Sequence, residues 1–326
     1  MSTLVTGAAG FIGYHLSEAL LARGEAVIGV DNLNDYYSVK LKESRLERLK
    51  RHKAFRFLNA DIAEREAFAS ALPEKATITA IVHMAAQAGV RYSLDHPDAY
   101  VRSNVMGQLS ILELCRVLPA LKHLVYASTS SVYGGNTKQP FSEDDRVDDP
   151  ISLYAATKKS AELMSHVYAR LFGIPSTGLR FFTVYGPWGR PDMSAYLFAD
   201  AIFADRPIKL FNGGDMRRDF TYVDDIVDGV VRVLDGPPVA RDGRPPEQIY
   251  NIGNHRPEQL THYVSVLERA IGKKAIIELA PMQPGDVKET YADISAIQRD
   301  FGFQPKTSIE EGVPRFVAWF KAYHGV

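Results

Sequence analysis

The sequence predicts an α/β fold built on a doubly wound parallel sheet, followed by a smaller α+β lobe. Short runs rich in Val, Ile and Leu alternate with longer amphipathic stretches through the first 180 residues. Strands that are buried on both faces of a parallel sheet show this pattern. After residue 180 the alternation loosens and Pro and Gly become more frequent. That change indicates a second, less regular unit.

The elements follow one another in the order that a doubly wound sheet requires. Two helices are expected near the N-terminus, at residues 11–24 and 64–72. We expect residues 1–180, joined by the 223–250 region, to form the first domain, and residues 181–326 to form mainly the second lobe, with the two interleaved. A binding cleft would lie between them, at the carboxyl ends of the strands. The expected strands are residues 3–7, 26–30, 55–60, 79–86, 122–128 and 176–182.

Composition excludes several classes of function. The 326 residues are 46% apolar and 24% charged, as in a globular protein long enough to bury a large core. The 38 basic and 39 acidic residues leave a net charge of −1, so no overall field would attract nucleic acid or an anionic membrane. No apolar run approaches the roughly 18 residues that span a bilayer, and the single cysteine, Cys115, cannot form an intrachain disulfide. A cytoplasmic protein without a metal site is expected.

The stretch TGAAGFIG places three glycines between an expected strand and an expected helix. Glycines let the backbone approach a pyrophosphate closely, and the helix N-terminus offers free N–H groups. Asp31 ends the next strand, where a carboxylate accepts hydrogen bonds from an adenosine ribose and repels a 2′-phosphate. NAD rather than NADP is therefore expected, the alternative being that Asp31 only begins a loop. The residues expected to bind it here are Gly7, Gly10, Phe11, Ile12, Gly13, Asp31 and Asn32.

The stretch SLYAATKKSAEL places Tyr154 and Lys158 four residues apart on an expected helix. Residues at this spacing share one face and can point at one substrate. An ammonium beside a phenol stabilises the phenolate, which makes the tyrosine a usable base at neutral pH. A half-exposed helix face would give the same spacing by chance.

The stretch ASTSSVYG, residues 127–134, follows an expected strand with four hydroxyl side chains. Ser and Thr are ordinary loop residues that bond their own backbone, so a plain strand end would explain them. The chain order changes that balance, because a nucleotide loop, a hydroxyl-rich strand end and a Tyr-x-x-x-Lys pair follow in one sequence.

Over essentially its whole length the sequence resembles the extended short-chain dehydrogenase/reductases that act on nucleotide sugars. The resemblance rests on TGAAGFIG, HMAAQAGVRYS, ASTSSVYG, YAATK, LRFFTVYGPWGRPDM, MRRDFTYVDDI and PGDVKETYAD. It implies that Tyr154 is the catalytic base, that Lys158 also anchors the nicotinamide ribose, and that Thr129 bridges Tyr154 and the reacting sugar oxygen. It also implies a homodimer built from the helix carrying Tyr154 and the helix around residues 100–118. Further NAD contacts are implied for Asp61, Ile62 and Ala85.

Departures from the family pattern distinguish between reactions. Relatives that dehydrate the sugar carry Asp-Glu after the threonine, and relatives that decarboxylate a sugar acid carry Glu before Val-Tyr-Gly, whereas this chain has Ser130 and Ser131. Thr183 stands where many hexose epimerases have Asn, and Arg190 follows it. By resemblance to uronic acid 4-epimerases, these four residues would hold a carboxylate at sugar C6. Arg is the natural bidentate partner for such a group.

The nucleotide half of the substrate is expected on the second lobe. The resemblance implies that Arg218 meets the diphosphate and that Asp286 meets the uridine ribose. The expected reaction interconverts UDP-glucuronate and UDP-galacturonate through a 4-keto sugar, with NAD recycled. A UDP-glucose/UDP-galactose 4-epimerase, a UDP-glucuronate decarboxylase and a nucleotide-sensing scaffold remain as alternatives.

Overall fold

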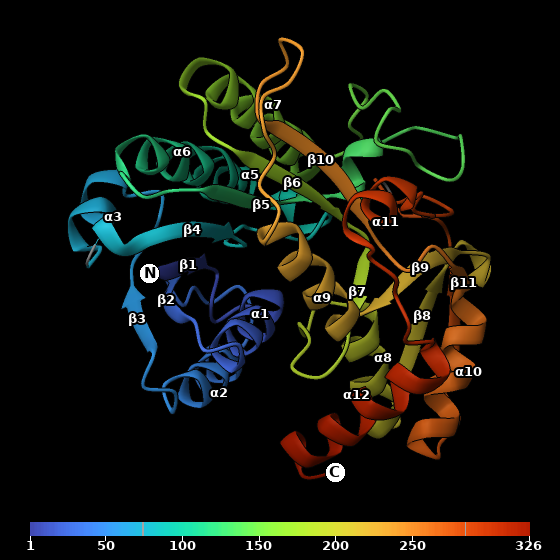
Figure 1. Cartoon of the computed structure of the whole chain (residues 1–326). Helices are drawn as coiled ribbons and strands as arrows, with labels where there is room; N and C mark the ends of the chain where they lie inside the picture. Colours follow the sequence, from blue (N-terminus) through green and yellow to red (C-terminus); the bar gives the residue numbers. More distant parts are fainter. Residues whose placement is uncertain (74, 284) are drawn as a thin grey trace.

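The main layer of the molecule is a seven-stranded sheet in the order β10-β6-β5-β4-β1-β2-β3, with every neighbouring pair of strands parallel (Figure 1). The structure, a computed structural model, describes residues 1–73, 75–283 and 285–326. The sheet confirms the predicted doubly wound architecture, to which a strand from the C-terminal third adds one edge. Its strands are β1 (Ser2–Thr6), β2 (Ala26–Asp31), β3 (Phe55–Asn59), β4 (Ile78–His83), β5 (His123–Thr129), β6 (Ser176–Phe181) and β10 (Glu247–Ile252).

Helices cover both faces of this sheet (Figure 1). One face carries α1 (Phe11–Ala22), α2 (Val39–Leu49) and α9 (Val223–Leu234), and the other carries α3 (Arg65–Ala71), α6 (Gly107–Val117) and α7 (Leu153–Phe172). Because both faces are covered, the inner strands β1 and β5 are buried along almost their whole length. The connections between β3 and α7 also contain η1 (Lys75–Thr77), α4 (Tyr92–Asp95), α5 (Pro97–Tyr100), the π-helix η2 (Val101–Met106) and η3 (Ser130–Tyr133).

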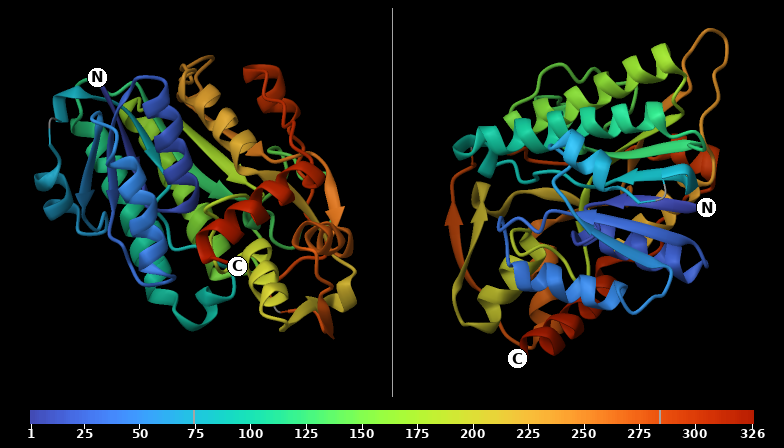
Figure 2. Two further views of the ribbon diagram at one scale, coloured as in Figure 1. Left: turned by 90° about the horizontal axis from the view of Figure 1, so that it is seen from below. Right: turned by 90° about the vertical axis from the view of Figure 1, so that its left-hand side faces the viewer.

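In the described residues, the second lobe is built from two small sheets and the α-helices α8, α10 and α12. Figure 2 shows it at one end of the molecule, coloured from yellow to red and ending in the C-terminal helix. Its three-stranded sheet has the order β11-β9-β7, and β12 pairs with β8 in a separate parallel ladder. Its elements are β7 (Thr183–Tyr185), α8 (Ser194–Phe203), β8 (Pro207–Phe211), η4 (Asn212–Gly214), β9 (Arg217–Tyr222), β11 (Pro257–Gln259), α10 (Leu260–Ile271), β12 (Ile276–Ala280) and α12 (Ile309–His324). Helix α11 (Ser295–Phe301) packs instead on β10 and α9 of the large sheet.

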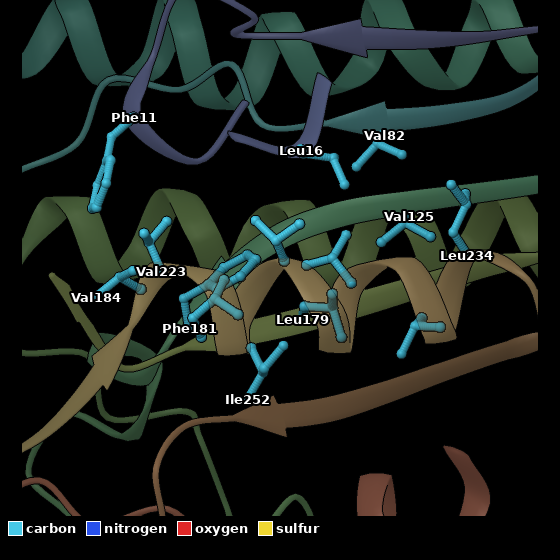
Figure 3. Packing of buried hydrophobic residues seen from close by; sticks show 14 of the residues in the cluster. Phe11, Leu16, Val82, Val125, Leu179, Phe181, Val184, Val223, Leu234 and Ile252 are labelled. Carbon is cyan, nitrogen blue, oxygen red and sulfur yellow. The ribbon is translucent and has the colours of Figure 1, made fainter. Parts of the chain in front are cut away.

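The core between the large sheet and α1 and α9 fixes the strand ends that carry the site. Val82, Val125 and Leu179, from three neighbouring strands, point toward the side chains of these helices (Figure 3). Burying such a side chain is worth roughly 1.5–3 kcal/mol, so the sheet is a rigid base for the loops at its carboxyl edge.

The chain crosses between the two units more than once. After β7 and α8 it returns to the large sheet with α9 and β10, and then goes back to the second lobe. The two units are therefore interleaved along the chain, and the domain boundary near residue 180 stays a prediction. Among the described residues, no helix is long and apolar enough to cross a bilayer, and no group of three or more His, Cys, Asp or Glu side chains is placed to hold a metal ion.

Candidate active site

A cavity of about 430 Å³ lies at the carboxyl ends of the parallel strands, and the second lobe lines its far side. Every residue to which the sequence assigned a role in binding or catalysis lines this cavity, although the roles themselves stay predictions. These residues are Gly7, Gly10, Phe11, Ile12, Gly13, Asp31, Asn32, Asp61, Ile62, Ala85, Thr129, Ser130, Ser131, Tyr154, Lys158, Thr183, Arg190, Arg218 and Asp286.

The glycine-rich loop leads into an open helix N-terminus. Gly7 has a φ of +70°, and a Cβ there would lie 2.8 Å from the backbone nitrogen of Ala85, so the loop and the end of β4 pack backbone against backbone. A Cβ on Gly13 would lie 2.1 Å from the carbonyl oxygen of Gly7. No described side chain caps α1 at Gly10, and its first turn contains no acidic residue. An uncapped N-terminus of this kind suits a diphosphate.

The carboxylate of Asp31 is oriented by backbone donors. Its two oxygens accept hydrogen bonds from the amides of Ala9 (3.1 Å) and Leu33 (2.9 Å). Burial raises the pKa of Asp31, while the bond from Leu33 and the charge of Lys42 oppose that rise. Each carboxylate oxygen can accept a further hydrogen bond, as a ribose would require.

The predicted adenine contacts lie beside Asp31, because β3 pairs with β2 and the amide of Ala60 donates to the Asp31 carbonyl (3.2 Å). Asp61 accepts a hydrogen bond from the amide of Ala63 (2.9 Å) and pairs with Arg102 (3.0 Å). Ile62 is buried, and the amide of Ala85 donates to Thr6 (3.2 Å). Both backbone segments are therefore fixed before any ligand arrives.

The hydroxyls of this row have different partners, although all four residues line the cavity. The hydroxyl of Ser128 donates to the buried carboxylate of Glu162 (2.7 Å), which also pairs with Arg180 (2.8 Å). The hydroxyl of Thr129 donates to the hydroxyl of Ser131 (3.3 Å), and the amide of Ser131 donates to the threonine hydroxyl (3.2 Å). The hydroxyls thus serve both the core and the cavity.

Helix α7 presents Tyr154 and Lys158 to the cavity. It begins at Leu153, where the Ser152 side chain accepts a hydrogen bond from Ala155. Burial raises the pKa of Tyr154, whereas a hydrogen bond with Thr129 and the charge of Arg190 lower it. Positive charge from Arg190 thus acts on the phenol, and the expected influence of Lys158 stays a prediction.

Lys158 itself is almost fully buried. Burial lowers its pKa to about 8, while the negative charge of Glu162 opposes that fall. Behind the helix, the Asn104 side chain donates to Thr157 (3.0 Å) and pairs with the backbone of Gln87. Asn104 lies in the π-helix η2, and such irregular turns are frequent at functional sites.

The guanidinium of Arg190 is already paired with a carboxylate. Its Nε donates to Asp192 (3.0 Å) and one terminal nitrogen donates to the other Asp192 oxygen. The hydroxyl of Tyr36 also donates to Asp192 (3.0 Å). Arg190 therefore lines the cavity as part of an ion pair, and its expected contact with a sugar carboxylate stays a prediction.

The same pattern occurs at the nucleotide end. Arg218 donates to Asp286 (2.7 Å), so two residues predicted to bind different parts of the substrate bind each other. Arg91 lies 3.8 Å from the other Asp286 oxygen and packs over the ring of Phe211. Arg91 thus brings a second guanidinium near the place predicted for the diphosphate.

Sequence reasoning missed Tyr36, Lys42, Arg91 and Asp192. Tyr36 lies between β2 and α2, whereas Lys42 lies within α2, and no sequence motif had assigned either residue a role in the site. Asp192 is two residues from Arg190, and this Arg-Pro-Asp spacing was the one local signal that could have indicated the pair.

A Rossmann sheet that brings a glycine-rich loop, a carboxylate at the end of β2 and a Tyr-x-x-x-Lys pair to one cavity defines a dinucleotide-dependent enzyme of the short-chain dehydrogenase/reductase class. Residues 3–253 match the model of the NAD dependent epimerase/dehydratase family. The chain belongs to that family.

The similar proteins include epimerases named for a sugar that carries a carboxylate and an epimerase named for a neutral sugar. A probable UDP-glucuronate 4-epimerase of Rhizobium meliloti is 47% identical, over 98% of this chain and 97% of that protein. The UDP-glucuronic acid 4-epimerase of Bacillus cereus, in complex with UDP-glucuronic acid and NAD, is 34% identical with a TM-score of 0.89, covering 99% of this chain and all of that one. UDP-glucose 4-epimerase of Thermotoga maritima, with UDP-glucose, is 29% identical with a TM-score of 0.86, at the same coverage.

Proposed function

We propose that the protein is a UDP-glucuronate 4-epimerase, which interconverts UDP-glucuronate and UDP-galacturonate. The observation that carries the proposal is the presence of Arg190, Thr183 and the serine hydroxyls on the same cavity as Tyr154. A guanidinium and several hydroxyl donors match a sugar that carries a carboxylate at C6. The Rhizobium meliloti and Bacillus cereus relatives, which bear this activity in their names, support the same substrate.

The other end of the cavity fits NAD. The open N-terminus of α1 and the loop at Gly7 would hold the diphosphate, Asp31 the adenosine ribose, Asp61 and Ile62 the adenine, and Lys158 the nicotinamide ribose. When bound, NAD accepts a hydride from C4 of the sugar and later returns it, so it is recycled.

The residues of the chain manage the proton and the position of the sugar. Tyr154 takes the proton of the C4 hydroxyl, directly or through Thr129, and gives it back at the end of the cycle. Burial and the charge of Asp192 raise the pKa of Tyr154, and the hydrogen bond with Thr129 and the charge of Arg190 oppose that rise. Between the two halves of the reaction the 4-keto sugar turns about its bond to the diphosphate, which Arg218 holds, and presents its other face.

The intermediate carries a chemical hazard. A 4-keto uronate is a β-keto acid and can lose CO₂. We assign Ser130, Ser131, Thr183 and Arg190 the joint task of holding the carboxylate in an orientation that is poor for breaking the bond between C5 and C6. Ser130 and Ser131 also replace the carboxylates that dehydratase and decarboxylase relatives use, which speaks against those two reactions.

A UDP-glucose 4-epimerase is the second candidate, and one observation favours it. Because Asp192 neutralises Arg190, a neutral hydroxymethyl group could face the pair without leaving a buried charge unpaired. The Thermotoga maritima relative has the name of that enzyme, at lower sequence identity.

The proposal includes a homodimer in the cytoplasm. Helices α6 and α7 run side by side along one face of the molecule (Figure 2), and apolar side chains there are exposed, including Leu163 at 57% and Leu171 at 67%. Exposed apolar patches of this kind mark interaction sites, and two copies would close a four-helix interface. Leu171→Glu should convert a dimer into a monomer in light scattering, whereas a wild-type monomer would contradict the dimer.

The test of the reaction is incubation of the purified protein, without added cofactor, with UDP-glucuronate, UDP-glucose or UDP-xylose, followed by proton NMR. UDP-galacturonate from the first substrate alone supports the proposed reaction and a retained NAD. UDP-galactose from the second would favour the hexose epimerase. If no substrate turns over even after NAD is added, the proposal fails and a nucleotide-sensing role gains support.

A further inference from the structure

Three features fix the ion pair between Arg190 and Asp192. Arg190 and Asp192 are separated by Pro191, whose ring restricts the backbone, and the amide of Met193 donates to the Arg190 carbonyl (3.2 Å) to close the turn. The guanidinium and the carboxylate meet in a bidentate arrangement. The third support is the hydroxyl of Tyr36, which donates to Asp192 from a segment 156 residues away in the chain.

Both partners of this pair carry their charge. Burial raises the pKa of Asp192, but Arg190 outweighs burial and the net pKa lies below the ordinary value. Burial likewise lowers the pKa of Arg190, and Asp192 raises it above its ordinary value. A bidentate pair of ionised groups fixes the plane of the guanidinium as well as its position.

The pair leaves one edge of the guanidinium unused by Asp192. A guanidinium has five N–H donors, and Asp192 takes the N–H of Nε and one N–H of a terminal nitrogen. The outer edge, formed by the two terminal nitrogens, keeps the fork geometry that matches a second carboxylate. Arg190 lines the cavity together with Thr183 and Ser131.

Tyr36 is itself fixed in place. Its ring packs on Tyr92 with centroids 4.7 Å apart, and its hydroxyl lies so close to Gly89 that a Cβ there would be 2.6 Å away. The segment that carries Tyr36 begins directly after Asp31. Residues 32–38 therefore join the nucleotide end of the cavity to the sugar end and do more than cover the edge of the sheet.

We propose that Asp192, held by the hydroxyl of Tyr36, is a positioning residue that fixes Arg190 and presents its outer edge to the carboxylate of the sugar. This inference rests on the proposed function and deepens it. It makes the Arg-Pro-Asp turn and residues 32–38 the elements that decide how the carboxylate is oriented. Because the pair has no net charge, the site binds the carboxylate through the geometry of its hydrogen bonds more than through net charge.

The consequence concerns the loss of CO₂ from the 4-keto intermediate. In that side reaction the C5–C6 bond breaks, its electron pair moves toward the C4 carbonyl, CO₂ leaves and C5 takes up a proton, which yields a UDP-4-keto-pentose. A carboxylate held in one plane is kept from the alignment that this cleavage needs. A guanidinium that is free to turn would let the carboxylate reach it.

The experiment compares Asp192→Asn, Tyr36→Phe and Tyr92→Phe with the wild type. UDP-glucuronate labelled with ¹³C at C6 is the probe, and kcat, KM and the fraction of label released as CO₂ are measured together with Tm. Asparagine has one acceptor oxygen and no charge and cannot reproduce the bidentate pair, so we expect Asp192→Asn to raise KM and the released fraction by roughly tenfold, the equivalent of one lost charge-assisted hydrogen bond. Tyr36→Phe should act in the same direction and more weakly.

The control and the remaining outcomes make the test decisive. Tyr92→Phe alters the ring that packs on Tyr36, but no hydrogen bond in the described residues joins Tyr92 to Asp192, so this variant should match the wild type. If Asp192→Asn does not fold, Tyr36→Phe decides. Wild-type KM and CO₂ release in the variants, with or without a lower Tm, would overturn the positioning role. A wild-type protein that does not convert UDP-glucuronate would instead overturn the proposed function.

Discussion

The hydroxyl of Ser128 donates to the buried carboxylate of Glu162 at 2.7 Å, whereas the hydroxyl of its neighbour Thr129 donates to Ser131 at the cavity (3.3 Å). Glu162 is also bound by Arg180 through both of its oxygens, at 2.8 and 3.0 Å. Two adjacent hydroxyls therefore have unrelated tasks, one in the core and one in the site. Alternation of side chains along a strand is the reason.

This division predicts opposite phenotypes for two serines. Ser128→Ala should lower the free energy of unfolding by about 1–2 kcal/mol, because a charge-assisted hydrogen bond is lost, and should leave KM for UDP-glucuronate unchanged. Ser131→Ala should raise KM with little change in stability. Urea unfolding and steady-state kinetics on both variants check this. An increased KM in Ser128→Ala at wild-type stability would contradict it.

The buried pair of Glu162 and Arg180 predicts a loss of stability in acid. Burial raises the pKa of Glu162, but the hydrogen bond and charge of Arg180 outweigh burial, so the pKa lies below 4.5. The stabilisation is therefore complete above about pH 4.5 and is lost as the pH falls through the lower, folded-state value. Glu162→Gln should cost roughly 3–5 kcal/mol near neutral pH, because Arg180 stays buried without its partner. The wild type and the variant should converge in urea unfolding as the pH falls, and a constant difference between them would argue against the pair.

Lys158 predicts a conflict between activity and stability. Its pKa is lowered from 10.5 to about 8, with burial as the main cause, so the folded protein carries a buried ammonium below pH 8 at a cost of roughly 3 kcal/mol. The cost is fully present below pH 8 and disappears as the pH rises toward the unfolded-state value. Lys158→Met should therefore be more stable than the wild type at neutral pH, with an advantage that shrinks above pH 8, and should lose roughly 100-fold or more in kcat.

Tyr154→Phe is the matched comparison for Lys158→Met. It should lose activity to a similar extent while its stability follows the wild-type dependence on pH. Urea unfolding near pH 7 and pH 9.5, together with turnover of UDP-glucuronate, separates the two variants. Lower stability of Lys158→Met near neutral pH would contradict the assigned cost of the buried ammonium.

Much of the fold was predictable because its signals are local. Apolar runs of strand length and the glycine spacing after β1 gave the positions of the first six strands along the chain, and the spacing of Tyr154 and Lys158 gave a shared helix face. The position of β10 at the sheet edge was not predictable in this way. Its pairing with β6 depends on contacts about 70 residues apart, and no local period reports them.

The candidate site was predictable in its residues but not in its charge state. Arg190 and Arg218 were identified by resemblance, yet each is paired with an aspartate in the fold. Whether a charged side chain faces the cavity alone or with a partner depends on tertiary packing. For Asp192 that packing includes Tyr36, which the sequence places 156 residues away. The alternation of side chains along β5 could have predicted from the sequence that the hydroxyls of Ser128 and Thr129 have different partners.

Arg45 predicts a link between the nucleotide loop and the turn before Arg190. Its fully buried guanidinium donates to the carbonyls of Ala9 (2.7 Å) and Trp188 (2.6 Å) and to the hydroxyl of Tyr37 (2.8 Å). Arg45→Met keeps much of the volume but leaves buried carbonyl groups without donors, so we expect a loss of about 3 kcal/mol or more and a higher KM for UDP-glucuronate.

Arg48 supplies the control for Arg45. It lies one turn away on α2, is exposed, and donates to the hydroxyl of Tyr14 (2.7 Å). Arg48→Met should cost less than about 1 kcal/mol and leave KM unchanged. Equal effects of the two substitutions in urea unfolding would refute a special role for Arg45.

Gly13 predicts that the nucleotide loop tolerates no side chain at the start of α1. In a helix, alanine is favoured over glycine by roughly 0.5–1 kcal/mol, but a Cβ on Gly13 would lie 2.1 Å from the carbonyl oxygen of Gly7. Overpacking against backbone costs about 1–3 kcal/mol or more, so the clash outweighs the gain in helix propensity. Gly13→Ala should therefore be less stable and should be purified without bound NAD, as measured by nucleotide released on denaturation.

Gly24→Ala is the control, because Gly24 has a φ of +84° with open space around it. That variant should lose about 1 kcal/mol from backbone strain alone and keep its NAD, whereas full NAD in Gly13→Ala would show that the loop can move aside.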